Sequence, residues 1–392
     1  MKKKYTLLLF LLLLIKPLQA QVLLSVYSEV SIVTAGPGTE LYEAFGHSAI
    51  RIKDPVLQLD LIYNYGMFDF NQPNFYTNFT KGKLLYKLAR YPFNYFLESY
   101  KNDKRWVKQQ VLNLNQEQKQ AFFRYLENNA LPENATYFYD PYFNNCATKL
   151  RDITKTILGN KLNYKTDHIE KNLSYRQLMD KEIPWNTWGS FGINLALGTK
   201  LDAIANTDDY MYLPDYVYTI FKESTVFIDN KPKKLIKRED ILLDFKELKQ
   251  NSSVLNPLLI FCIPLIIGLF ITYFDFKKQK RSKWLDFTLL FITGIVGVLI
   301  IFLWFFTDHS TTPNNFNVLW AFAPNTIIAF LLLKKTPKKW LTSYFKFLFI
   351  LLLILAVLWI FGVQHFPIAV IPLLILLLIR YLFLSKKLNS VF

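Results

Sequence analysis

Five long apolar runs in the last third of the chain constrain its fold more than any other feature. They cover residues 255–276, 284–306, 318–333, 341–361 and 366–384. A helix needs about 20 apolar residues to cross the hydrocarbon core of a bilayer, and most of these runs are near that length. The third run is shorter, and the pair Pro324 and Asn325 interrupts it. We therefore predict a membrane domain over residues 255–392 with about five transmembrane helices.

The charges between these runs predict how the membrane domain is oriented. Basic residues follow the first, third and fifth runs, whereas residues 307–317 and 362–364 contain no Lys or Arg. By the positive-inside rule, the basic loops and the C-terminus lie in the cytoplasm. The formal net charge of +16 is partly explained by these anchoring loops, so it does not indicate a nucleic-acid partner.

The other end of the chain carries the pattern of an export signal. Lys2, Lys3 and Lys4 precede an apolar stretch that is short for a spanning helix, and Leu18-Gln19-Ala20 is typical of a cleavage site. An uncleaved anchor stays an alternative. We predict a signal peptide over residues 1–20, an exported domain over residues 21–237 and a linker over residues 238–254. The protein is then a multi-pass protein of the bacterial inner membrane with a periplasmic N-terminal domain.

The exported part has the mixed pattern of an α+β domain. Apolar, β-branched stretches predict strands, and amphipathic stretches with capping residues predict helices. The predicted strands are 22–34, 47–52, 60–66 and 105–114, with a hairpin of 225–228 and 234–237. The predicted helices are 115–129, 146–159, 174–181, 187–197 and 215–222.

Cys146 is the one cysteine of the exported domain, since Cys262 lies within the first apolar run. An odd cysteine outside the reducing cytosol indicates a reactive thiol or an intermolecular bridge. Cys146 stands where a loop enters a predicted helix, and backbone N–H groups at a helix start stabilise a thiolate. The alternative is a small, buried apolar side chain.

A thiol nucleophile needs a base, and His47 and His168 are the only histidines of the exported domain. We favour His47, because a strand holds it rigidly and the preceding Gly46 allows close approach. A histidine beside a cysteine at a helix start is the geometry of papain-like catalysis, in which the thiolate attacks an acyl carbon. A lone histidine on a strand is otherwise more often structural.

Further polar groups complete the predicted catalytic site. Asp60 and Asn64 share one face of the next strand, and either side chain would orient the imidazole; we favour Asn64. The backbone N–H of Cys146, helped by the Asn145 side chain, would stabilise an oxyanion. No metal-binding or phosphate-binding motif is present in the sequence, and we expect no cofactor and no metal.

Three segments of the chain resemble a known family. They are Phe45 to Arg51, Asn64 to Phe70 and Asn145 to Asp152. These segments are similar to the periplasmic domain of the Lnb-type lipoprotein N-acyltransferases of Bacteroidota. The resemblance extends to Asp308-His309 and to Asn315 through Trp320 in the membrane half. The order of histidine and cysteine also resembles the permuted papain-like fold (NlpC/P60-like or LRAT-like) of lecithin-retinol-type acyltransferases.

The resemblance implies acyl transfer at the membrane surface. A fatty acyl chain would move from a phospholipid to the N-terminal amine of a diacylglyceryl-cysteine lipoprotein. Cys146 would be the nucleophile and His47 the general base. The implied partners are a phospholipid donor, a diacylated lipoprotein acceptor and the bilayer.

Asp308, His309 and Asn315 lie in an exported loop, where they would bind a headgroup or the acceptor amine; a solvated loop is the alternative. Arg176 and Asp202 are further polar candidates, for which a structural role is the simpler interpretation. Two other functions stay open. One is a membrane-tethered cysteine peptidase or amidase of the cell envelope, and the other is a non-enzymatic envelope scaffold.

Overall fold

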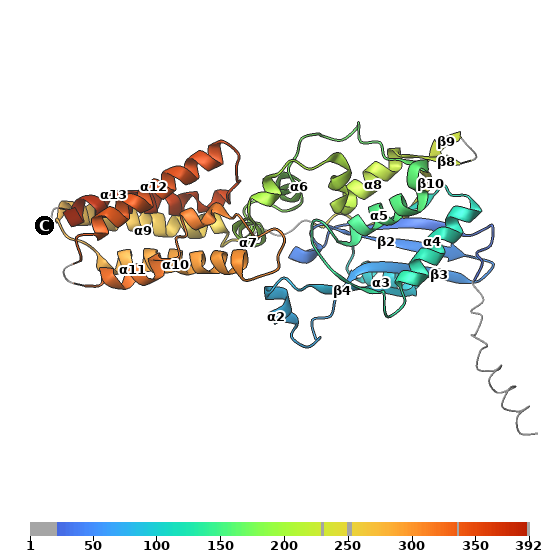
Figure 1. Cartoon of the computed structure of the whole chain (residues 1–392), viewed down its shortest axis with the longest axis horizontal. Helices are drawn as coiled ribbons and strands as arrows, with labels where there is room; N and C mark the ends of the chain where they lie inside the picture. The colour runs from blue at the N-terminus through green and yellow to red at the C-terminus, as the bar shows by residue number, and fades with distance from the viewer. Residues whose placement is uncertain (1–21, 229–230, 249–252, 335–336, 390–392) are drawn as a thin grey trace, which may run out of the picture.

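The protein has a mixed α+β N-terminal domain that sits on one end of an elongated helix bundle (Figure 1). The computed structural model describes residues 22–228, 231–248, 253–334 and 337–389. The signal peptide predicted over residues 1–20 lies outside the described residues. The C-terminal end of the bundle is the end farthest from the N-terminal domain (Figure 1).

A seven-stranded sheet forms the centre of the N-terminal domain, and all of its neighbouring strands are antiparallel. In spatial order the strands are β10 (Ile236–Leu243), β5 (Val107–Leu112), β1 (Glu29–Ala35), β2 (His47–Asp54), β3 (Leu59–Met67), β4 (Leu85–Pro92) and β6 (Thr136–Phe138). Side chains of a strand alternate between two faces. Ile32, Ile50 and Tyr63 therefore join the core on one face, while Val33 and Ile62 join a second core on the other.

Helices cover both faces of this sheet. On one face lie α4 (Gln116–Asn129) and α5 (Cys146–Leu158), and α5 packs directly on β2 and β3. Phe93 and Phe96 of α3 (Phe93–Asn102) pack against the other face. The predicted capping of α4 is confirmed, because Asn115 and Gln118 form a reciprocal capping box. The cores on both faces hold β2 and β3 rigidly.

The helices of the second half of the domain follow the predicted boundaries within one residue. They are α6 (Tyr175–Glu182), α7 (Trp188–Ala196) and α8 (Pro214–Glu223). A small sheet of β7 (Leu162–Asn163), β8 (Thr225–Ile228) and β9 (Lys231–Lys234) lies beside them. The second strand of the predicted hairpin is thus placed three residues earlier than expected.

Two predicted boundaries of the domain need correction. The strand predicted over residues 22–34 begins only at Glu29. The predicted linker 238–254 is too long, because residues up to Leu243 form the edge strand β10 and pair with β5. Four charged residues in a row, residues 237–240, hide β10 in the sequence, and they are tolerated because an edge strand leaves side chains in water.

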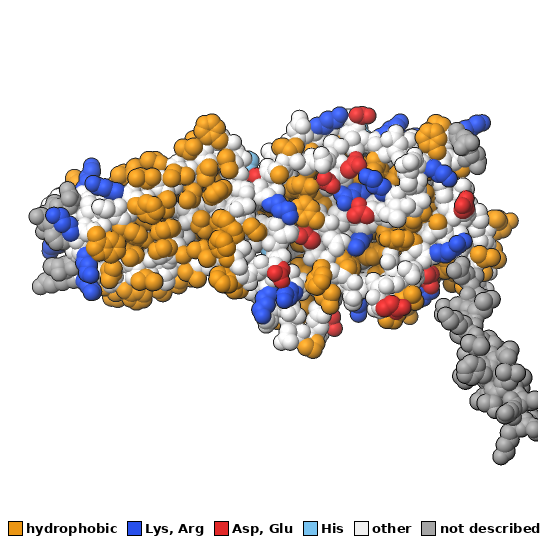
Figure 2. All heavy atoms as spheres, in the orientation of Figure 1, with side chains coloured by type: hydrophobic (Ala, Val, Ile, Leu, Met, Phe, Trp, Pro, Cys, Tyr) orange, Lys and Arg blue, Asp and Glu red, His pale blue; other side chains and the backbone are white. Residues whose placement is uncertain are grey.

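The bundle contains, among the described residues, four helices of spanning length. They are α9 (Pro257–Lys277), α10 (Lys283–Phe305), α12 (Leu341–Ile360) and α13 (Ile371–Asn389). Hydrophobic side chains cover most of the bundle surface in Figure 2, and basic side chains gather at its far end. At that end Arg380 bonds to Asp286 and Asp275 at 2.6 and 2.7 Å, so these buried charges of three helices are paired.

The third predicted span is the exception. It consists of a short 3-10 turn, η5 (Phe316–Leu319), a non-helical stretch and α11 (Asn325–Leu332). Irregular backbone at membrane depth needs protein around it, and α10 supplies this at Gly297, where a Cβ would overlap the carbonyl of Ala321. Arg281 donates to the carbonyl of Leu332 at 2.7 Å, so α11 ends at the far end of the bundle. A total of five spans stays a prediction, because it counts this broken segment in addition to the four long helices.

Candidate active site

Cys146 is the first residue of α5, and the cap of this helix fixes its position. The side chain of Asn145 accepts from the N–H of Thr148 at 2.9 Å, and the Thr148 hydroxyl accepts from the N–H of Asn145 at 2.8 Å. This reciprocal capping box orients the helix start. Cys146 is 9% exposed and free of a disulfide.

His47 begins β2, directly beside this helix. Gly46 makes the tight entry to the strand possible: its φ is +71°, and a Cβ there would lie 2.8 Å from the carbonyl oxygen of Ala35. The imidazole of His47 and the thiol of Cys146 are hydrogen-bonded. The structure thus brings together two residues that the sequence could only pair by elimination.

Asn64 of β3 is the third member of this arrangement. Its Oδ1 lies 2.6 Å from Nε2 of His47, which leaves Nδ1 of the ring for the thiol. Its Nδ2 donates to the hydroxyl of Tyr91 at 2.9 Å, so the amide orientation is fixed by a second bond. The other candidate for this position, Asp60, forms two 2.7 Å bonds with Arg51 instead.

The surroundings of the thiol favour its ionised form. Burial alone would raise the pKa of Cys146, but the charge and hydrogen bond of His47 and the N–H groups of Ser48 and Ala147 lower it overall. For His47, burial acts to lower the pKa, while the negative charge and hydrogen bond of Cys146 and the bond to Asn64 raise it overall. The two groups therefore favour a thiolate–imidazolium pair, which is the reactive state of a nucleophilic cysteine.

The side chain of Asn145 holds neighbouring backbone segments in place around the site. Its Nδ2 donates to the carbonyls of Pro141 and Tyr212 at 2.7 and 2.8 Å. Stabilisation of an oxyanion by this amide would require one of these bonds to be exchanged. Stabilisation of an oxyanion by the backbone N–H groups at the start of α5 would not require these side-chain bonds to break.

Three neighbours of the site were not predicted: Ser48, Tyr91 and Gly66. Gly66 has φ +90°, and a Cβ on it would meet Cys146 and Tyr139 within 4 Å. In the sequence, Gly66 stands within a strand of otherwise large side chains. A glycine at such a position indicates that another group approaches the backbone closely, so this contact could have been predicted. Tyr91 gave no signal, because its strand was not recognised.

The predicted substrate-binding residues lie between the domain and the bundle. The N–H of Asp308 donates to the carbonyl of Lys81 at 2.8 Å, and burial lowers the pKa of His309, which also bonds to the backbone of Phe79 and Thr80. Asn315 is fully buried and donates to the carbonyl of Leu195 at 2.8 Å. These residues dock the two parts of the protein on each other, and Asn315 has no exposed surface for a ligand.

Arg176 and Asp202 form a second contact between the two parts. Arg176 is 1% exposed and holds both oxygens of Asp202 at 2.9 and 3.0 Å. Asp202 also lies 2.9 Å from Nδ1 of His365, which belongs to the loop before α13. This bond raises the pKa of His365. The pair is structural, as the simpler interpretation of the sequence had it.

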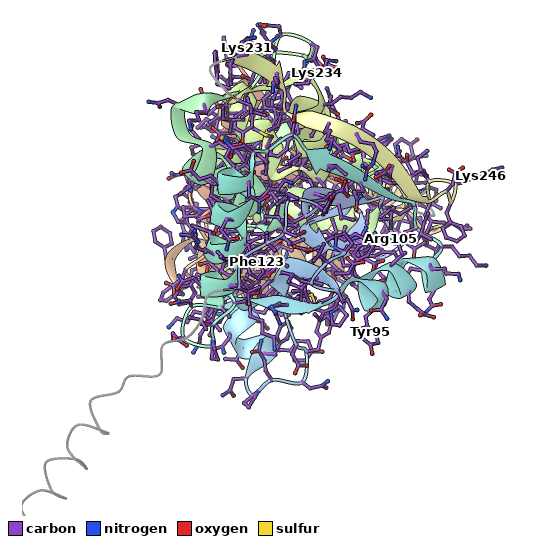
Figure 3. All side chains as sticks on the ribbon, turned by 90° about the vertical axis from the view of Figure 1, so that its right-hand side faces the viewer. Tyr95, Arg105, Phe123, Lys231, Lys234 and Lys246 are labelled. Atoms are coloured by element: carbon purple, nitrogen blue, oxygen red, sulfur yellow. The ribbon has the colours of Figure 1, made fainter. Side chains whose placement is uncertain are left out.

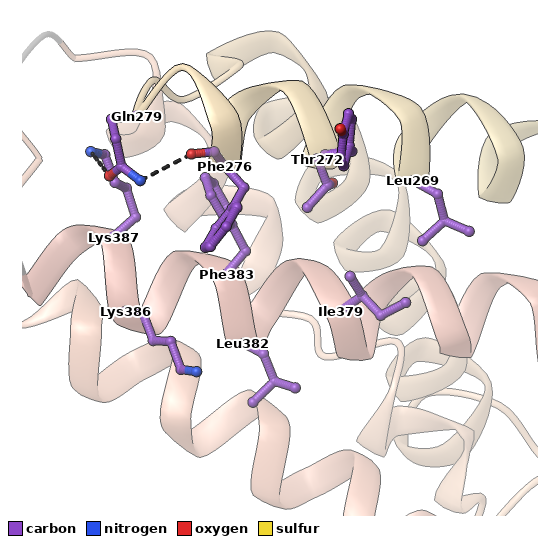
Figure 4. A pocket seen from close by; sticks show the side chains of 10 residues that line it. Leu269, Thr272, Phe276, Gln279, Ile379, Leu382, Phe383, Lys386 and Lys387 are labelled. Atoms are coloured by element: carbon purple, nitrogen blue, oxygen red, sulfur yellow. Dashed lines mark hydrogen bonds between the residues drawn. The ribbon is translucent and has the colours of Figure 1, made fainter.

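A surface hollow among the described residues lies elsewhere. It has a volume of about 530 Å³ and is lined by α9 and α13 near Gln279 and Lys386, at the far end of the bundle (Figure 4). It is remote from Cys146 and does not belong to the site. No group of three or more His, Cys, Asp or Glu residues in the described part of the chain is arranged to hold a metal ion.

Comparison with known families matches both parts of the chain. A family model described as the Lnb N-terminal periplasmic domain matches residues 20–188, which include Cys146, His47 and Asn64. A second, described as the Lnb transmembrane domain, matches residues 249–389. No curated protein and no solved structure matches the chain.

Proposed function

The chain belongs to the Lnb family, and from this premise we propose that it is a thiol-dependent acyltransferase of lipoproteins. It would move a fatty acyl chain from a phospholipid to the N-terminal amine of a diacylglyceryl-cysteine lipoprotein. The observation that carries the proposal is the hydrogen-bonded series Cys146–His47–Asn64 in a domain that is docked on a membrane bundle.

The first half-reaction acylates the enzyme. The thiolate of Cys146 attacks the ester carbonyl carbon of the phospholipid, so a C–S bond forms and the ester C–O bond breaks. The leaving alkoxide takes the proton that His47 holds, and a lysophospholipid departs. Backbone N–H groups at the start of α5 are suited to stabilise the oxyanion of this step.

The second half-reaction transfers the acyl group. The uncharged α-amine of the lipoprotein attacks the thioester, so a C–N bond forms and the C–S bond breaks. His47 takes the proton that the amine loses, which restores the thiolate–imidazolium pair. Asn64 keeps the imidazole in the orientation that both steps need.

The membrane bundle supports this choice of substrates, because both the donor and the acceptor are anchored in lipid. A hydrolase of soluble peptides would gain little from four long apolar helices. We propose a permuted papain-like arrangement of the domain, in which the strand that carries His47 precedes in the chain the helix that carries Cys146. We also propose a location in the bacterial inner membrane with the C-terminus in the cytoplasm, on the basis of the loop charges.

Asp308 and His309 are proposed to lie near the headgroup of a bound lipid, since their loop lies next to the short helix α2 (Phe75–Thr80) at the end of the bundle. If His309→Ala leaves both the rate and the substrate affinity of transfer unchanged, this role is excluded. For Asn315 the buried contacts support a docking role instead.

Mass spectrometry of a reporter lipoprotein tests the function. The wild-type chain and Cys146→Ser are expressed in cells that lack their own N-acyltransferase. An additional amide-linked acyl chain with the wild type alone is the expected result. If correctly folded wild type adds none but cleaves cell-wall peptides, the peptidase or amidase alternative takes first place. If Cys146→Ser retains full function in cells, the scaffold alternative does.

A further inference from the structure

The helix α2 (Phe75–Thr80) exposes large aromatic side chains at an unusual place. Phe70, in the loop before it, is 50% exposed, Tyr76 is 71% exposed and Phe79 is 49% exposed. Two lysines, Lys81 and Lys83, follow directly. Packing inside the domain does not account for side chains with this much free surface.

The position of α2 indicates what covers these side chains. The helix lies beside the end of the bundle that carries the N-terminal domain, and it projects past the outline of the bundle (Figure 1). The loop between α10 and η5 holds it there: Asp308 bonds to the carbonyl of Lys81, and a Cβ on Gly82 would overlap the backbone of His309. A bilayer around the bundle would therefore have its surface at the level of α2.

The chemistry of α2 fits such a surface. Aromatic side chains are enriched at the boundary between lipid and water, and lysines beside them attract lipid phosphates. Tyr95 of α3 provides a contrast. It is 65% exposed and points outward in Figure 3, but α3 lies farther from the bundle than α2 does (Figure 1).

An unbroken series of aromatic rings connects α2 to the catalytic thiol. The ring centroids of Phe79 and Phe75 are 6.1 Å apart, those of Phe75 and Phe68 6.0 Å, those of Phe68 and Tyr86 4.9 Å, and those of Tyr86 and Tyr139 4.4 Å. Tyr139 and Cys146 both lie within 4 Å of the same point above Gly66. We call the series Phe79–Phe75–Phe68–Tyr86–Tyr139 the aromatic path.

On the basis of the proposed function, we propose that the aromatic path binds the acyl chain of the donor phospholipid, with α2 inserted among the outer-leaflet lipids at its entrance. Cys146 lies in the core of the N-terminal domain and not in the bundle, so a donor ester that reaches the thiolate draws its acyl chain toward that domain. Apolar rings along the route reduce the exposure of the chain to water, at about 25 cal/mol for each Å² covered.

A comparison of two acyl donors tests the path. The full-length protein is reconstituted in vesicles of phosphatidylethanolamine and phosphatidylglycerol, and acylation of Cys146 is measured by intact-protein mass spectrometry. The second donor is p-nitrophenyl acetate, which reaches the thiol from water. The variants are the double substitution Tyr76→Ser/Phe79→Ser and the matched control Tyr95→Ser.

We expect the ratio of the phospholipid rate to the soluble-ester rate to fall at least tenfold in Tyr76→Ser/Phe79→Ser. The same ratio should stay within twofold of wild type in Tyr95→Ser. An unchanged ratio in the double variant would overturn the proposal. If the wild type accepts the soluble ester but never the phospholipid, the proposed function fails. The next measurement then tests by itself whether α2 contacts lipid.

A photo-cross-linking residue, p-benzoylphenylalanine, measures lipid contact without any need for activity. Placed at Tyr76 in the vesicle-bound protein, it is expected to attach covalently to phospholipid on illumination. Placed at Tyr95, it should attach to none. No lipid labelling at Tyr76 would show that α2 does not lie in the bilayer surface. Equal labelling at both positions would show that lipid contact does not distinguish α2 from α3. Either result would overturn the proposal.

Discussion

Replacing Asn64 by alanine tests whether the imidazole is oriented as the structure indicates. The change removes the 2.6 Å bond between Oδ1 of Asn64 and Nε2 of His47 and leaves the rest of β3 in place. A hydrogen bond to a charged group contributes about 1.5–3 kcal/mol. If the bond is made in full at the transition state, acylation of Cys146 slows by about 10- to 150-fold, at about 1.4 kcal/mol for each factor of ten.

The assay is the rate at which acyl-enzyme appears on Cys146, followed by mass spectrometry with a saturating soluble ester. Tyr91→Phe is the matched control: it removes one partner of Nδ2 of Asn64, the hydroxyl at 2.9 Å, and keeps the contact of Nδ2 with Met67 and the bond to the imidazole. We expect it to slow the reaction by less than about fivefold, because a neutral hydrogen bond contributes about 1 kcal/mol or less here.

One result would refute the reasoning. If Asn64→Ala unfolds at the wild-type temperature and still acylates Cys146 at the wild-type rate, the bond to His47 does not contribute to the reaction. A loss of rate accompanied by a large loss of stability would instead be resolved by Asn64→Asp. Its carboxylate can accept the same bond and is expected to recover most of the rate.

Three further changes test other parts of the structure. Alkylation of the Cys146 thiol by iodoacetamide should persist below the pH range of an ordinary cysteine, because the pKa of Cys146 is lowered. The proposed acyl transfer should decline again at high pH as the imidazolium of His47 loses its proton. Arg176→Ala removes the buried cation that pairs with Asp202, although the bond of Asp202 to His365 remains, and should destabilise the protein by about 3–5 kcal/mol in thermal unfolding. The exposed Arg238→Ala should cost about 1 kcal/mol or less. Gly198→Ala places a Cβ against the carbonyl of Pro313 and should expose the linker to proteases, whereas Gly192→Ala, which meets nothing, should not.

Contrary results would be equally informative. An ordinary thiol pH profile would show that the imidazole does not stabilise the thiolate. Equal unfolding temperatures for Arg176→Ala and Arg238→Ala would show that the buried pair of Arg176 and Asp202 stabilises the protein no more than the exposed ion pair does. Identical protease sensitivity of the two glycine variants would show that the contact at Gly198 does not hold the domain on the bundle.

Much of the fold was predictable because its signals are local. The apolar runs, the alternation in β2 and β3, and the caps at Asn115 and Ser174 each depend on a few neighbouring residues. The predictions failed where distant contacts override local pattern. The sequence of the edge strand β10 is charged and was predicted to be a linker. The sequence of α2, with its exposed aromatic residues, predicted neither a helix nor a strand.

The sequence by itself determined the two-part organisation, the orientation that we infer for the membrane helices, and the location of Cys146 at a helix start. These follow from composition, loop charge and helix capping, which need no knowledge of distant contacts. Only the tertiary structure decided that His47 reaches this thiol and that Asn64 rather than Asp60 faces the imidazole, because Arg51 binds Asp60 from the neighbouring strand. It also decided that Asn315 is buried in the contact between the parts. Such pairings depend on sheet register and on the docking of one part on the other, which bring together residues far apart in the chain.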